Sequence, residues 1–89
     1  MGNKYSFKMY FEDSSSKVLG GKASTAENLK YDFDGLLSWD EYDKISAKEL
    51  SAKEVADLAK KLYNAKNNNK IIRVEIVNIL TNEVVVSSN

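Results

Sequence analysis

The first strand-like pattern lies at the start of the chain. Residues 4–12, KYSFKMYFE, alternate between apolar and polar side chains, as expected of a strand with one buried face. A serine-rich turn follows, and residues 17–25 form a weaker strand pattern that contains two adjacent glycines. These patterns predict an N-terminal hairpin over residues 4–25. Its buried face would carry Tyr5, Phe7, Met9 and Phe11.

A second hairpin is predicted at the other end, over residues 70–88. KIIRVEIVNI (70–79) is rich in β-branched residues, and VVVSS (84–88) has the same character. The short connection between them contains Asn82, which can adopt the left-handed conformation that hairpin loops require.

The middle of the chain changes to a helical period. Residues 50–66 place apolar side chains at the spacing of a core-facing helical stripe. Ser51 and Glu54 match a capping box, but Ser46 and Glu49 match it equally well. The helix could therefore begin at either serine, or a short helix could precede a longer one. The predicted stripe consists of Val55, Leu58, Ala59 and Leu62.

Together these elements predict an α+β fold. About four antiparallel strands, two N-terminal and two C-terminal, would form a sheet with the main helix near 50–66 packed on one face, in ββ(α)αββ order. A chain of 89 residues has room for a single domain, 1–89. Between the N-terminal hairpin and the helix, residues 26–49 form an acidic and aromatic segment of turn and helix.

Composition narrows the possible chemistry. The chain has no cysteine and no histidine, so it lacks thiolate nucleophiles, disulfides, and the commonest general base and zinc ligand. We therefore expect no enzymatic activity and no cofactor. No apolar run approaches 18 residues, and we expect a soluble, cytoplasmic protein with no membrane contact. Abundant Lys, Asn and Ile without proline suggest a bacterial or phage source.

One segment, KYDFDGLLSWDEY (30–42), resembles the calcium-binding loop of the EF-hand family. With Gly35 at the sixth position, side-chain oxygens fall at the third, fifth, ninth and twelfth positions. This resemblance implies a calcium site. The residues concerned are Asp32, Asp34, Ser38 and Glu41. Lys30, however, occupies the first position, where the family has an acid.

A turn followed by a capped helix explains the same residues without a metal. Asp34 and Gly35 form a turn, and Ser38 and Glu41 form a capping box. Leu37 and Tyr42 are then placed to form the hydrophobic staple. We favour this interpretation and predict no metal ligand, with a degenerate calcium loop as the alternative.

The same segment combines aromatic and acidic residues. Large aromatic side chains commonly anchor protein interfaces, and carboxylates around them would suit a basic partner. We predict a small binding module that contacts another protein, and such a surface is compatible with a phage or mobile-element inhibitor that mimics nucleic-acid charge. The alternative is that these aromatic residues fill the core. The acidic-aromatic surface is predicted to comprise Asp32, Phe33, Asp34, Trp39, Asp40 and Tyr42.

A basic stretch over residues 60–73 supports a different alternative, nucleic-acid binding. Lysines near the C-terminus of a helix are also favoured by the helix dipole, which explains most of them without a ligand. The candidate residues are Lys60, Lys61, Lys66, Lys70 and Arg73.

Overall fold

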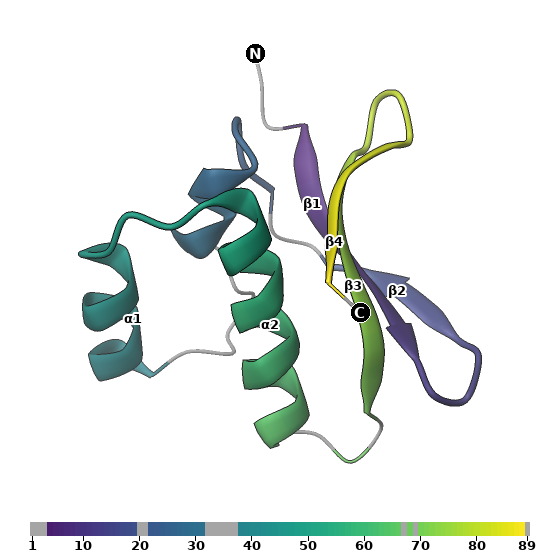
Figure 1. The fold of residues 1–89 in the computed structure, drawn as a ribbon, viewed down its shortest axis with the longest axis horizontal. Helices are drawn as coiled ribbons and strands as arrows, with labels where there is room; N and C mark the ends of the chain where they lie inside the picture. The colour runs from purple at the N-terminus through teal and green to yellow at the C-terminus, as the bar shows by residue number, and fades with distance from the viewer. Residues whose placement is uncertain (1–3, 20–21, 32–37, 67, 69, 89) are drawn as a thin grey trace.

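The computed structural model describes residues 4–19, 22–31, 38–66, 68 and 70–88, and Figure 1 shows their arrangement. Strands lie at both ends of the chain and helices in the middle. The elements are β1 (Tyr5–Phe11), β2 (Ser16–Val18), the 3-10 helix η1 (Glu27–Tyr31), α1 (Trp39–Ser46), α2 (Ala52–Lys66), β3 (Ile71–Asn78) and β4 (Glu83–Ser88).

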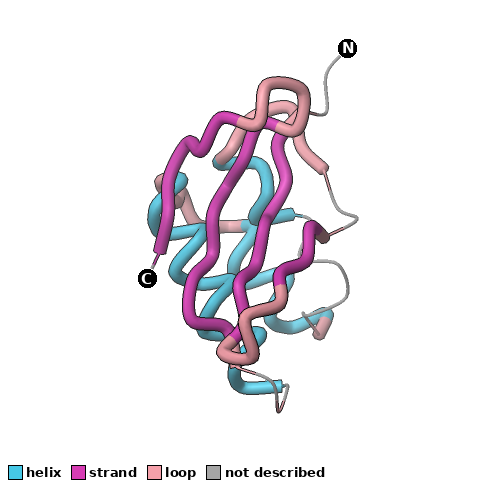
Figure 2. The backbone as a smooth tube through the Cα atoms, turned by 90° about the vertical axis from the view of Figure 1, so that its right-hand side faces the viewer, coloured by secondary structure: helices cyan, strands magenta, loops and turns pink. Residues whose placement is uncertain are grey.

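The strands form one antiparallel sheet in the order β2-β1-β3-β4. The two hairpins therefore meet where β1 pairs with β3, at the centre of the sheet. The helices cover one face of the sheet, and the other face is open toward the viewer in Figure 2. The predicted α+β class, the strand number and the ββ(α)αββ order are confirmed.

The core lies between α2 and the covered face of the two central strands. Phe7 and Met9 of β1 are completely buried, as are Val74 and Ile76 of β3. The helix contributes a narrower stripe than the sequence predicted, because Leu58 and Leu62 are only partly buried at its flanks. The fully buried helix residues are Val55, Ala56 and Ala59.

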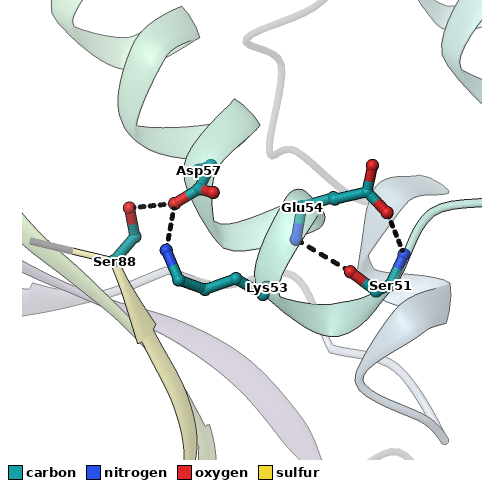
Figure 3. A network of polar contacts seen from close by, with 5 residues as sticks. All are labelled: Ser51, Lys53, Glu54, Asp57 and Ser88. Carbon is teal, nitrogen blue, oxygen red and sulfur yellow. Dashed lines mark hydrogen bonds and ion pairs between the residues drawn. The ribbon is translucent and has the colours of Figure 1, made fainter.

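Of the two candidate capping boxes, the one at Ser51 begins α2. Its hydroxyl accepts a hydrogen bond from the Glu54 amide at 3.2 Å, and the Glu54 carboxylate accepts one from the Ser51 amide at 3.0 Å (Figure 3). Ser46 is instead the last residue of α1. A short helix therefore precedes the main one, with a separate start.

The N-terminal hairpin is shorter than predicted. The second strand ends at Val18 rather than near residue 25, although Ala23 still forms an isolated bridge with Tyr5. The chain then turns away from the sheet into η1, which the sequence analysis missed. Leu29 is completely buried and packs η1 against the core. The Gly20–Gly21 pair lies outside the described residues.

The C-terminal hairpin follows the prediction closely. Asn82 has a φ of 63°, so it takes the left-handed conformation expected of it. The start of β3 is fixed by Asn64 at the end of α2, whose side chain accepts from the Ile71 amide at 2.7 Å and donates to the Ile71 carbonyl at 3.1 Å. In the part of the chain that is described, no helix has the length and apolar character needed to cross a membrane.

Candidate protein-binding site

The candidate site is built on α1, which lies on the outer side of α2, away from the sheet (Figure 1). Ser38 and Glu41 start this helix with the predicted capping box, in which each side chain bonds the backbone amide of the other residue. Ile45 is the one buried residue of α1 and holds it to the core. The remaining side chains of α1 are exposed or half-buried and are available to form a surface.

An aromatic cluster, defined by Tyr31, Trp39 and Tyr42, occupies the start of α1. The ring centroid of Tyr42 lies 6.3 Å from that of Trp39, edge to face, and 6.4 Å from that of Tyr31. Trp39 is 83% exposed and Tyr31 is 46% exposed, while Tyr42 is half-buried between them. Trp39 is therefore a surface residue, so the alternative that these aromatic residues fill the core does not hold for Trp39.

Charged groups surround the cluster. Asp40 and Asp43 are exposed on α1, and the Lys30 ammonium lies 5.0 Å from the centre of the Tyr31 ring, within cation–π range. Glu41 is already engaged: besides its cap, it forms an ion pair with Lys66 at 3.1 Å. The Ser38 amide and then Lys66 hold the pKa of Glu41 below its usual value, because both stabilise the charged carboxylate.

Half of the predicted acidic-aromatic surface lies outside the described residues. Asp32, Phe33 and Asp34 belong to this half, so the structure places Trp39, Asp40 and Tyr42 only. The same gap contains Asp32, Asp34 and Gly35 of the loop that resembles an EF-hand, and the calcium alternative stays untested. Among the residues that are described, no group of three acidic side chains could hold a metal ion.

The basic stretch does not form one surface. Lys66 bonds Glu41, and the Lys70 ammonium donates to the Asn64 carbonyl at 2.6 Å. Arg73 lies across the sheet from these lysines, because it is opposite Tyr10 on the face that the helices leave open. Arg73 therefore lies on a different face from Lys66 and Lys70, and all three already bond carboxylates or a carbonyl of the chain itself.

A polar group on the open face of the sheet was missed by the sequence analysis. Glu75 is only 5% exposed, and its carboxylate accepts from the Tyr10 hydroxyl at 2.8 Å and from Arg73 at 2.9 Å. The Lys8 ammonium lies 5.2 Å from the centre of the Tyr10 ring. The alternation of β1 and β3 could have indicated this group, since all four residues occupy the outward positions of neighbouring strands.

Comparison with known proteins gives no further guide to function, because no family model matches the chain and neither a curated protein nor a solved structure shows significant similarity to it.

Proposed function

We propose that this protein is a non-enzymatic binding module that attaches to another protein through the acidic-aromatic surface of α1. One observation carries the proposal: Trp39, the single tryptophan of the chain, is 83% exposed at the start of a capped helix. An exposed tryptophan costs free energy in water, and tryptophan is among the residues that contribute most to protein interfaces when covered. Its contact with Tyr42 gives the indole a defined orientation before a partner arrives.

The charges beside Trp39 indicate what kind of partner fits. Asp40 and Asp43 are exposed on the same helix, while Glu41 is held by Lys66. Two exposed carboxylates around an aromatic anchor favour a partner surface rich in Lys or Arg, because opposite charges accelerate encounter and orient the two proteins. A nucleic-acid-binding protein presents such a surface, and this chain would then act as an inhibitor that competes with nucleic acid.

The test is affinity capture from the native host with three baits. The wild-type chain should retain a basic partner, and Trp39→Ala should lose it. Leu80→Ala is the matched control, because Leu80 is 77% exposed but lies in the loop between β3 and β4, at the other side of the molecule. The proposal fails if all three baits retain the same proteins, or if Leu80→Ala loses the partner and Trp39→Ala keeps it.

A further inference from the structure

The two edges of the sheet are protected very differently. At one edge, β2 has three residues and includes an exposed lysine, Lys17. At the other edge, β4 has six residues with three consecutive valines and neither lysine nor proline. Short strands, lysines and prolines are the usual features that prevent an edge strand from pairing with another chain. Among the described residues β4 pairs with β3 alone, so its outer backbone groups are available.

The bulge in β4 gives this strand an unusual symmetry. The register shifts between the pairs Ile76–Val86 and Val77–Val84, which leaves Val85 as the extra residue. Val85 lines a shallow hollow with Tyr5 and Ala26 on the helix-covered face, and Val86 packs on the core beneath it. Two successive residues therefore face the helices at the middle of the strand.

The outer positions of β4 complete the pattern. Val84 is opposite Val77 and Ser87 is opposite Glu75, so both face the open side of the sheet. Glu83 and Ser88, at the two ends, face the helix side. From Glu83 to Ser88 the order is helix side, open side, helix side, helix side, open side, helix side, which is the same in both directions.

We propose that β4 pairs antiparallel with β4 of a second copy of this chain. Opposite residues of an antiparallel pair face the same side of a sheet, and the symmetrical order satisfies this condition at all six positions. Glu83 of one copy would lie opposite Ser88 of the other, Val84 opposite Ser87, and Val85 opposite Val86. The two-fold axis makes this a closed dimer, because each copy uses its one β4 edge.

The charges of the chain favour this direction of pairing. Glu83 is the one charged residue of β4, and parallel pairing would bring two copies of it together. Antiparallel pairing places it instead beside Ser88, whose hydroxyl donates to Asp57 (Figure 3). Lys53 forms an ion pair with Asp57 at 2.8 Å, and the charge of Lys60 also lowers the pKa of this carboxyl. Antiparallel pairing therefore separates the two Glu83 side chains and brings each of them toward the Lys53–Asp57 ion pair of the other copy.

The end of β4 is also held in place before any pairing. The Ser88–Asp57 hydrogen bond attaches it to α2, and Val86 packs against the core, so little order has to be gained on binding. Pairing of six residues is smaller than a typical stable interface of about 1,600 Å². We therefore expect a weak dimer, with a Kd of roughly 10 μM to 1 mM.

Sedimentation equilibrium of the wild-type chain across roughly 10 μM to 1 mM tests the proposal. The weight-average mass should rise with concentration along the curve of a monomer–dimer equilibrium and never exceed twice the monomer mass. A monomer at every concentration would overturn the proposal, and so would continued growth beyond a dimer, which a closed two-fold pair does not allow.

Two matched lysine substitutions then locate the contact. Val85→Lys should raise the Kd about tenfold or more, since a charge on an edge strand prevents pairing. Val18→Lys is the control, because Val18 is 48% exposed and Val85 is 44% exposed, but Val18 lies on the opposite edge. Equal effects of the two substitutions would contradict the assignment to β4.

Circular dichroism checks that each variant is folded. If Val85→Lys does not fold, Glu83→Lys carries the test, because it places an ammonium group beside Lys53 of the second copy. An unchanged Kd in Glu83→Lys would overturn the proposed register.

Discussion

One pair of substitutions, Leu29→Ala and Trp39→Ala, tests whether Trp39 belongs to the surface and not to the core, by comparing their effects on the free energy of unfolding. Both remove a large apolar side chain from neighbouring helical segments. Leu29 is 0% exposed, so its truncation leaves a cavity under η1 and should reduce the free energy of unfolding by about 2–5 kcal/mol.

Trp39 has little covered area to lose. It is 83% exposed, and a large aromatic side chain covers about 150–250 Å² when fully buried, so roughly 40 Å² is at stake. At about 25 cal/mol per Å² this area corresponds to ~1 kcal/mol, of which the better helix propensity of alanine returns about half. Trp39→Ala should therefore cost about 0.5 kcal/mol.

Thermal unfolding followed by circular dichroism measures both effects without needing the tryptophan signal. In a domain of this size 1 kcal/mol corresponds to roughly 4–8 °C, so Leu29→Ala should lower the Tm by at least ~8 °C and Trp39→Ala by ~4 °C or less. A Trp39→Ala variant that loses ~2 kcal/mol or more would refute the reasoning, because the indole would then belong to the core.

Three further predictions concern caps, acid and metal. In urea unfolding, Ser51→Ala should lower the free energy of unfolding by about 0.5–2 kcal/mol, whereas Ser46→Ala, at the other candidate cap, should change it by about 0.5 kcal/mol or less. Equal costs would contradict the assigned start of α2. Hydrogen bonds from Ser51 to Glu54 and from Lys53 to Asp57 hold the pKa of each carboxyl below its ordinary value. The two carboxylates therefore contribute fully to stability above the ordinary pKa values of 4.5 and 3.8, and this contribution is lost as pH falls through the lowered pKa values; a Tm that stays constant or rises below pH 4.5 would contradict this. Millimolar calcium should leave the Tm unchanged, whereas a site half-filled at about 100 μM would add ~1.4 kcal/mol at 1 mM; a rise in the Tm that Glu41→Gln abolishes would support the EF-hand alternative.

The strands and the main helix could be predicted from the sequence because their signals are local. The alternation of residues 4–12 specifies a strand with one buried face, and the β-branched run at 70–79 specifies a second strand; both strands were confirmed. The conformation of Asn82 was equally predictable, since the hairpin loop requires a residue that tolerates positive φ.

Other features depend on contacts between distant segments and were not predictable. Two equivalent capping signals at Ser46 and Ser51 could not be ranked without knowing where α1 ends. The 3-10 helix forms because Leu29 finds a place in the core, which its own short segment does not reveal. Likewise the ion pair joins Glu41, which the sequence assigned to a helix cap, to Lys66 of the separate basic stretch.

The exposure of Trp39 was left open by the sequence for a similar reason. A tryptophan beside Tyr42 in an acidic segment fits a small core as well as an interface. Only the packing of α1 decides between them, because Ile45 and not Trp39 is the residue that α1 buries.

The measurement that tests the central claim most directly is fluorine NMR of the chain labelled with fluorotryptophan. The chain has one tryptophan, so a single signal reports on position 39 even when the captured partner contains tryptophans of its own. In the free protein this signal should show the solvent isotope shift of an exposed indole. On addition of the partner it should move and lose that isotope shift, as Trp39 becomes covered. A signal that keeps its position and its isotope shift in the saturated complex would show that the partner binds elsewhere.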